Sequence, residues 1–146
     1  MTIPPDLLLA YQKALYWVRS SPNIMLRIGT ISEQARDLLR EHDADSAAIL
    51  TSDNPQSELR SEEENDFYRD QLQQEVVQSQ CTFFLTVSVD PTGQWPDEHG
   101  FLVLDLPETE LHRLLRKFDQ AAAVWLDNTG QVTLVSQRVE SGPESD

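Results

Sequence analysis

The sequence has few of the residues that build covalent or metal-bound scaffolds. Cys81 is the single cysteine among 146 residues, which excludes an intrachain disulfide and a four-cysteine zinc site. Five glycines and eight prolines are too few for a collagen-like or low-complexity chain. Basic residues are scarce as well, because 11 Lys and Arg stand against 25 Asp and Glu, a net charge of −14. Such a surface repels phosphate backbones and anionic lipids, so we expect neither a nucleic-acid partner nor a membrane partner.

Long apolar runs are also absent. No segment approaches the roughly 18 apolar residues of a membrane span, and the apolar run at residues 7–10 is too short for the core of a signal peptide. Together with the unpaired thiol, this predicts a cytoplasmic protein. We expect one globular domain over residues 1–138, present as a monomer or homodimer, and a disordered acidic tail over residues 139–146.

Hydrophobic periodicity predicts four helices. Apolar residues at helical spacing indicate a first helix that opens at Pro5 and continues to Val18. Two pairs have the spacing of a capping box, Thr30 with Glu33 and Ser61 with Glu64, so the second and third helices should begin there. A fourth helix should follow Asp105, which can cap it.

Six strands are expected between these helices, over residues 24–28, 47–51, 81–89, 101–104, 122–126 and 132–135. Helices and strands therefore mix without strict alternation of strand, helix and strand. This order favours an α+β fold, in which one mixed β-sheet has about four helices packed on it.

Two loops have residue types that suit a site. The turn at residues 51–57 ends a buried strand, and its Asn54 and Ser57 offer donors and acceptors just before a helix begins. The alternative is that Asp53, Asn54 and Ser57 only close turns and cap backbone groups. The loop at residues 93–100 contains Trp95, Glu98 and His99. Adjacent side chains on one loop cannot all point at one ion, so we assign no metal site, and Trp95 is either a stacking wall or a lid on the core.

Other reactive residues give no clear signal. Nothing near Cys81 in the sequence lowers the pKa of its thiol, so buried packing is the better interpretation. His42 and His112 stand in polar helical surroundings and are expected to be exposed. No nucleophile elbow, P-loop or dinucleotide fingerprint occurs, so we assign no catalytic residue and no cofactor.

Acidic residues are concentrated in one segment. Residues 41–70 contain ten acids against Arg60 and Arg69, and Glu62, Glu63 and Glu64 stand in succession at a helix start. Complementarity to the helix dipole and solubility account for such a run. A docking face for a basic protein partner is the alternative.

Several of these segments, taken in order, resemble one protein family. The stretch Thr51-Ser52-Asp53-Asn54-Pro55-Gln56-Ser57 is similar to the Thr-Ala-x-Asn-Pro-x-Ser stretch of the bacterial domain-of-unknown-function family 3293. The similarity continues through Asn65, Trp95 and Glu98 to the run at residues 116–121, and Tyr11 and Tyr16 fall where that family places aromatics. Ser52 and Ala121 depart from the family pattern, as does Glu58, where a basic residue is frequent. The resemblance implies a set of positions and no activity.

The polar positions lie in separate segments, each at the end of an element or in a loop. If they converge, they form a pocket that binds a small polar ligand, and a buried network that fixes loop geometry is the alternative. A hydrolase is a third hypothesis, for which the sequence offers no nucleophile beside a base. The residues predicted to bind the ligand are Thr51, Asn54, Ser57, Asn65, Trp95, Glu98 and Gln120.

Overall fold

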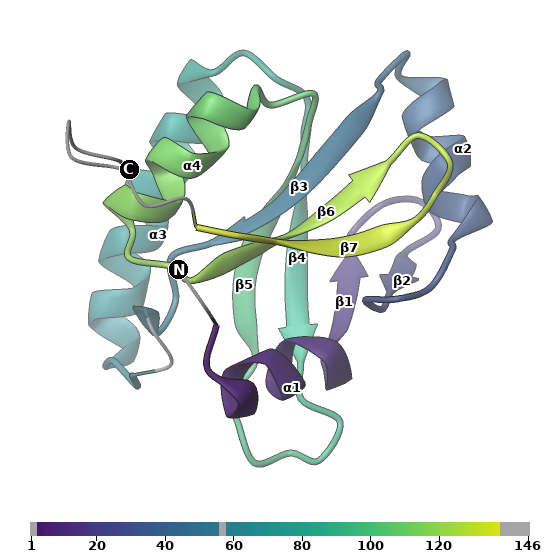
Figure 1. The fold of residues 1–146 in the computed structure, drawn as a ribbon. Coiled ribbons are helices and arrows are strands. Elements are labelled where there is room, and N and C mark those ends of the chain that lie inside the picture. Colours follow the sequence, from purple (N-terminus) through teal and green to yellow (C-terminus); the bar gives the residue numbers. More distant parts are fainter. Residues whose placement is uncertain (1–2, 56–57, 138–146) are drawn as a thin grey trace, which may run out of the picture.

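The computed structural model describes residues 3–55 and 58–137, and its fold is built on one antiparallel sheet (Figure 1). Within these residues the sheet has seven strands in the order β2-β1-β4-β5-β3-β6-β7. The strands are β1 (Leu15–Val18), β2 (Ile24–Leu26), β3 (Ser46–Thr51), β4 (Phe83–Val89), β5 (Glu98–Leu104), β6 (Ala122–Asp127) and β7 (Val132–Ser136). The helices are α1 (Pro5–Lys13), α2 (Glu33–Glu41), α3 (Glu62–Gln78) and α4 (Glu108–Lys117).

The fold class is α+β, as expected, but the prediction of a mixed sheet is wrong, because every strand pair is antiparallel. The sheet stays antiparallel because each of two helical crossovers joins strands that are not neighbours. β3 and β4 run in the same direction across α3, and β5 lies between them. β5 and β6 likewise run in the same direction across α4, and β3 lies between them. These four strands and two helices have the connectivity of the ferredoxin-like split β-α-β unit.

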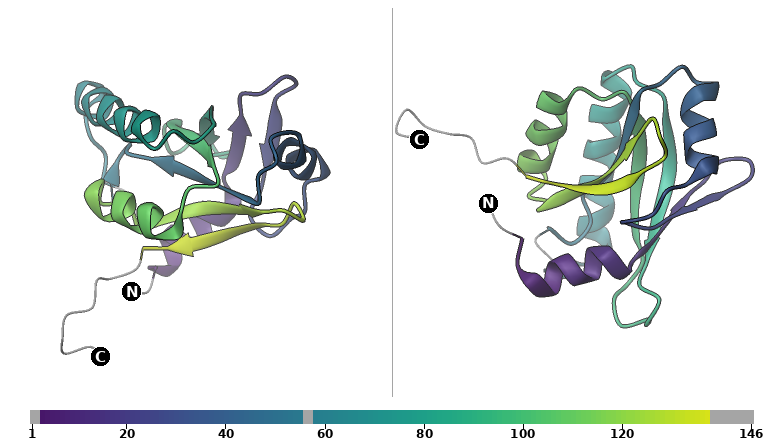
Figure 2. Two further views of the ribbon diagram at one scale, coloured as in Figure 1. Left: turned by 90° about the horizontal axis from the view of Figure 1, so that it is seen from above. Right: turned by 45° about the vertical axis from the view of Figure 1, so that its right-hand side comes forward.

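The two faces of the sheet have separate cores. α3 and α4 cover one face, where Leu72, Val76, Leu111 and Leu115 pack on strand residues such as Phe101. On the other face, α2 packs through Ala35, Leu38 and Leu39. The second core contains residues from both ends of the strand order, because the sheet curls around it (Figure 2).

The curled sheet is closed differently at its two ends. At one end, α2 and the chain before it complete the wall, since Gly29 N–H donates to Val132 O and Val132 N–H donates to Thr30 O. At the other end lies α1 (Figure 1), in which no residue is fully buried. This second end contains the candidate site.

The first predicted helix is too long. The helix ends at Lys13, and residues 15–18 form strand β1, which pairs with β2 and β4. Tyr16 and Val18 are buried while Trp17 is partly exposed, so burial here alternates with the period of a strand. Aromatic and β-branched residues favour this conformation, and their apolar pattern also fits a helix over a single turn.

Some predicted caps are also wrong. The capping box of Ser61 and Glu64 is confirmed. The second helix is capped instead by Ser32, whose hydroxyl accepts from Ala35 N–H. Asp105 caps no helix, because its carboxylate accepts from the backbone N–H groups of Asp45 and Ser46.

Three smaller expectations can be compared with the structure. His112 is buried, with only 4% of its surface exposed, so its predicted exposure is wrong, whereas His42 is exposed. Cys81 is partly buried against the core beneath α3 and α4. In the described residues no helix is long and apolar enough to cross a membrane. The tail predicted over residues 139–146 lies outside the described residues.

Candidate functional site

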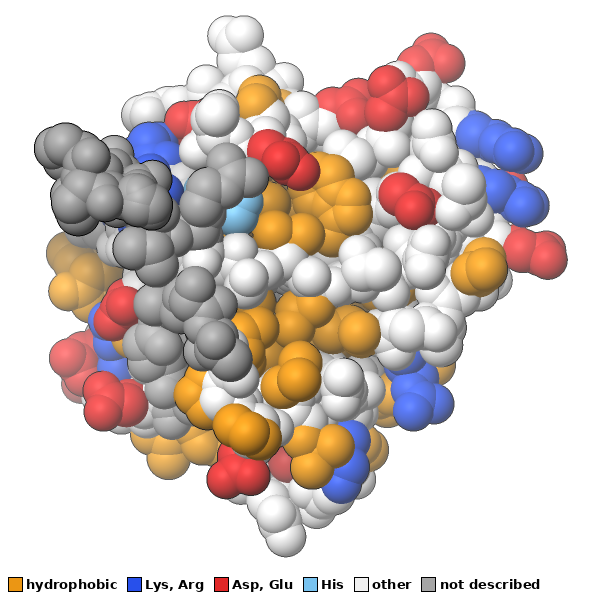
Figure 3. Space-filling model, viewed as in Figure 1, with side chains coloured by type: hydrophobic (Ala, Val, Ile, Leu, Met, Phe, Trp, Pro, Cys, Tyr) orange, Lys and Arg blue, Asp and Glu red, His pale blue; other side chains and the backbone are white. Residues whose placement is uncertain are grey.

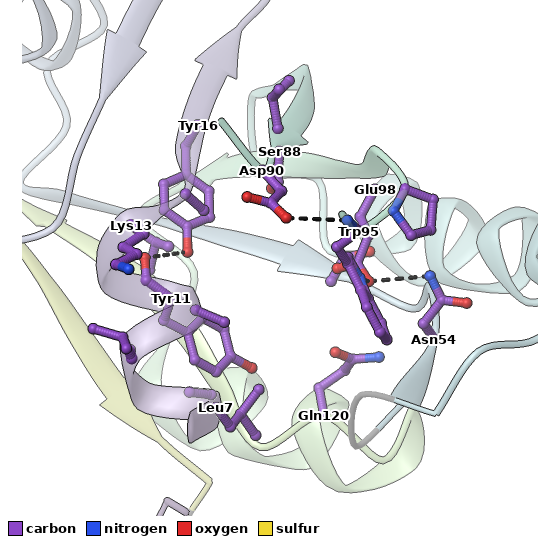
Figure 4. Close-up of a pocket in the computed structure, with 18 of the residues that line it drawn as sticks. Leu7, Tyr11, Lys13, Tyr16, Asn54, Ser88, Asp90, Trp95, Glu98 and Gln120 are labelled. Carbon is purple, nitrogen blue, oxygen red and sulfur yellow. Dashed lines mark hydrogen bonds between the residues drawn. The ribbon is translucent and has the colours of Figure 1, made fainter. Parts of the chain in front are cut away.

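A cavity of about 720 Å³ lies between α1 and the inner face of the sheet (Figure 4). Seven segments of the chain line this cavity. Three come from the first part of the chain: α1, β1, and β3 with the turn after it. The other four are the end of β4, the β4–β5 loop, the start of β5 and the segment that enters β6. Apolar side chains are exposed on the molecular surface where α1 lies (Figure 3). The wall on the α1 side is mostly apolar and includes Leu7, Ala10, Tyr11 and Ala14.

Strand register builds the polar wall of the cavity. Tyr16 on β1 lies opposite Ser88 on β4, and Ser88 lies opposite Glu98 on β5. Directly opposed residues on neighbouring strands share one face of the sheet, so these three side chains form a row across the inner face. All three line the cavity.

Glu98 is the acidic side chain of this row. Its Oε2 accepts from Trp95 Nε1 at 2.9 Å and from Asn54 Nδ2 at 3.1 Å. Burial raises the pKa of this carboxyl, and the negative charge of Asp53 adds to the effect, while the hydrogen bonds from Trp95 and Asn54 oppose it. Among the described residues, Oε1 has no hydrogen-bond partner, so it can still accept from a ligand.

Asp90 organises the loop that presents Trp95. Its carboxylate accepts from the backbone N–H groups of Thr92 at 2.9 Å and Trp95 at 3.0 Å. Hydrogen bonds from Thr92 are the largest cause that lowers the pKa of Asp90. Gly93 lies between them at φ +73°, a left-handed conformation that glycine adopts without steric cost. The indole is therefore held at the rim by its backbone and by its bond to Glu98.

Asn54 is held from behind by Asn65. Asn54 N–H donates to Asn65 Oδ1, and Asn65 Nδ2 donates to Asn54 Oδ1, each at 3.0 Å. Arg60 N–H also donates to Asn54 Oδ1 at 3.0 Å. These contacts keep Asn54 at φ +44°, a left-handed conformation that asparagine tolerates better than most residues, and they direct its Nδ2 to Glu98.

Asp53 joins the same turn to α3 and β5. Its carboxylate, buried to 2% exposure, accepts from Arg69 at 2.8 and 2.9 Å and from His99 N–H at 2.8 Å. Its backbone carbonyl accepts from Gln120 Nε2 at 3.2 Å. Thr51 adds a hydroxyl that donates to His99 O at 2.7 Å and accepts from Asp53 N–H. These bonds fix the turn without using the carboxylate of Glu98 or the side-chain oxygen of Gln120.

Two tyrosines connect α1 to the cavity. The Tyr16 hydroxyl donates to Tyr11 O at 3.0 Å, which ties α1 to β1. Burial raises the pKa of Tyr11 to about 12, with the charge of Glu98 as a second cause, and burial also raises the pKa of Tyr16. Both phenols are therefore neutral at physiological pH, and both add ring surface to the wall.

Most of the predicted site residues lie together. Five of them line the cavity: Thr51, Asn54, Trp95, Glu98 and Gln120. Asn65 is buried behind Asn54 and positions it, and Ser57 lies outside the described residues. That these residues bind a ligand stays a prediction.

Sequence reasoning missed the α1 wall and the buried ion pair. The helical spacing of the first segment predicts one apolar face and contains no sign that this face borders a cavity. The pair of Asp53 with Arg69 has no signal in the sequence, because Arg69 is 16 residues away on α3. Ser88 looks like any polar residue in a strand until its register opposite Glu98 is known.

Comparison with protein families agrees with the resemblance seen in the sequence. The model of the family described as "Protein of unknown function (DUF3293)" matches residues 50–123. The chain belongs to this family. The matched segment contains the turn after β3, all of α3 and the loop with Trp95 and Glu98, but not α1. No curated protein and no solved structure matches the chain.

The arrangement is rich in acceptors. Glu98 Oε1 has no described partner, and Gln120 uses its Nε2 on backbone carbonyls, so its side-chain oxygen remains to accept. No three His, Cys, Asp or Glu side chains of the described ranges group so that they could hold a metal ion. The chemistry suited to the site is recognition of hydrogen-bond donors on an organic molecule.

Proposed function

We propose that this member of the DUF3293 family binds a small polar organic ligand in the cavity between α1 and the sheet. The convergence of Asn54, Glu98 and Gln120 on one cavity of about 720 Å³, with Trp95 at its rim, supports this most directly. Ligand sites are typically clefts of this size with a mostly apolar lining and a few placed polar groups.

The network behind the cavity supports binding more than a purely structural role. A network that only fixed loop geometry would satisfy its own polar groups. Here the residues set back from the cavity are satisfied, since Asp53 and Asn65 use both polar atoms of their side chains. At the cavity, Glu98 and Gln120 each keep an acceptor without a described partner.

Hydrolysis is less well supported than binding. Ser88 and Glu98 lie opposite each other, yet no hydrogen bond joins them among the described residues. A base activates a nucleophile through such a contact. We therefore propose recognition without a covalent step.

Docking of a basic partner remains a prediction from the sequence. The acids Glu62, Glu63 and Glu64 occupy the first turn of α3, where negative charge complements the helix dipole, and Glu64 completes the capping box. The local structure thus accounts for this run without a partner.

The test combines ligand discovery with a block of the cavity. Native mass spectrometry of the protein drawn gently from its own host should show a retained mass of small-molecule size. Ala10→Phe places a ring on the α1 wall and should abolish retention, whereas Gln12→Phe, on an exposed α1 position outside the lining, should not. No retained mass, or equal retention by the two variants, would refute the proposal.

A further inference from the structure

Carboxylates that are buried or partly buried in this protein differ in how their charge is balanced. Asp53 pairs with Arg69 at 2.8 Å, and Glu75 pairs with Arg113 at 2.8 Å and also with Lys117. Glu98 forms no salt bridge with any described residue, although burial is the largest influence on its pKa. A desolvated carboxylate without a cation is costly, and a ligand that brings the cation removes that cost.

The other charged residues around the cavity do not provide a cation for Glu98. Asp6 and Lys13 lie exposed at the α1 side, and Asp90 is occupied by the backbone of its own loop. With Glu98, the lining therefore has three acids and one base. An anionic ligand would approach the partly buried carboxylate of Glu98, which forms no salt bridge with a described cation, and this disfavours phosphates and carboxylates.

The rings at the cavity suit a cation as well. Figure 4 shows Tyr11 and Trp95 on two sides of the cavity, with Gln120 at the edge between them. Aromatic faces attract ammonium and guanidinium groups, more strongly where water is excluded. The hydrogen bond from Trp95 Nε1 to Glu98 also places the indole and the carboxylate together, so one ligand can contact both.

We infer that the cavity selects an organic cation, an ammonium or guanidinium group on a flat apolar body, with Glu98 as its counter-ion. This inference rests on the proposed binding function and names the ligand class of that same site. Glu98 Oε1 and the side-chain oxygen of Gln120 accept from the cationic group. The body of the ligand lies between Trp95 and the apolar wall of α1.

Three probes with one ring system test the charge preference. Tryptamine has an ammonium group at neutral pH, tryptophol has a hydroxyl in its place, and indole-3-acetate has a carboxylate. We expect tryptamine to bind the intact protein about tenfold more tightly than tryptophol, as measured by calorimetry or ligand-observed NMR, and indole-3-acetate to bind least.

Two matched variants assign the preference to Glu98. Glu98→Gln retains the shape and can still accept from Trp95 and Asn54, but it removes the negative charge. It should therefore lower tryptamine affinity about tenfold and change tryptophol affinity much less. Glu63→Gln removes one charge on exposed α3 surface and should change neither. Circular dichroism and thermal unfolding of each variant establish that it is folded before affinities are compared.

The outcomes separate the two proposals. The ligand class is overturned if tryptamine and tryptophol bind with equal affinity, or if indole-3-acetate binds more tightly than either. It is also overturned if Glu63→Gln lowers tryptamine affinity as much as Glu98→Gln does. In each of these cases, loss of binding in Ala10→Phe would still support the cavity as the site. Failure of all three probes to bind would overturn the ligand class. If, in addition, native mass spectrometry shows no retained small molecule, the proposed binding function is refuted as well.

Discussion

Asn65→Ala tests whether the turn at the cavity is held by the side-chain pair described above. Asn65 is buried at 8% exposure, and both of its side-chain polar atoms bond to Asn54. Alanine removes these two hydrogen bonds and leaves the N–H of Asn54 buried without a partner. Asn54 Oδ1 retains the bond from Arg60 N–H. The perturbation is therefore confined to one donor and two bonds.

The expected loss of stability follows from those contacts. A hydrogen bond contributes about 1 kcal/mol net, and a buried donor left unsatisfied costs about 1–3 kcal/mol. Alanine has a better helix propensity than asparagine, which returns about 0.5 kcal/mol. The bond to Asn54 Oδ1 accounts for about 1 kcal/mol and the unsatisfied N–H for about 1–3 kcal/mol, so after the propensity gain the free energy of unfolding should fall by about 1.5–3.5 kcal/mol.

Urea unfolding followed by tryptophan fluorescence measures this change. Gln74→Ala, at an exposed position on the same helix, is the control and should change stability by less than about 0.5 kcal/mol. A loss below about 1 kcal/mol for Asn65→Ala would refute the reasoning, because Asn54 would then be held by contacts other than this pair. If the pair does position Nδ2 of Asn54, the same variant should also weaken tryptamine binding.

Further predictions concern the charges and the tight packing near the cavity. Arg69→Ala leaves Asp53 buried without its cation and should cost about 2–3 kcal/mol, reduced from the 3–5 kcal/mol of a fully buried pair because 26% of the Arg69 side chain is exposed. Gly100→Ala would place a Cβ 2.3 Å from Leu50 O and should cost about 3 kcal/mol, whereas Gly93→Ala, with open space around it, should cost only about 1 kcal/mol for its left-handed backbone. Glu98→Gln should unfold at higher urea concentration than the wild type at pH 7. Because the folded-state pKa of Glu98 is raised, the wild type gains stability as pH falls toward the ordinary value of 4.5. The difference in urea midpoint between Glu98→Gln and the wild type should therefore narrow as pH falls. A difference that stays constant with pH would contradict this prediction.

Local signals in the sequence predicted the parts of the fold that local interactions decide. Ser61 and Glu64 form the expected capping box because both partners lie within one helical turn. Thr30 and Glu33 have the same spacing, but Ser32 caps the helix, and the Thr30 hydroxyl donates to Arg27 O. Ser32 has Ala35 three residues later, so the capping-box pattern alone favours Thr30, and tertiary structure sets the helix start two residues further along.

The candidate site depends on contacts that the sequence does not display. Asn54 and Glu98 are 44 residues apart, and they meet because β3, β5 and the turn between β3 and α3 lie side by side. The resemblance to a family identified these positions as a set but gave no physical reason why they should lie together. The strand register provides that reason, since it places Glu98 opposite Ser88 and both on the inner face.

Three departures from ordinary protein structure occur around the same cavity. Asn54 has a left-handed backbone, Glu98 has a buried charge without a described cation, and α1 covers the sheet without one fully buried residue. Each has a local cost, whether strain, desolvation or apolar surface left partly exposed. Costs that gather at one cavity, while Asp53 and Asn65 behind it are fully bonded, are what a preorganised binding site requires.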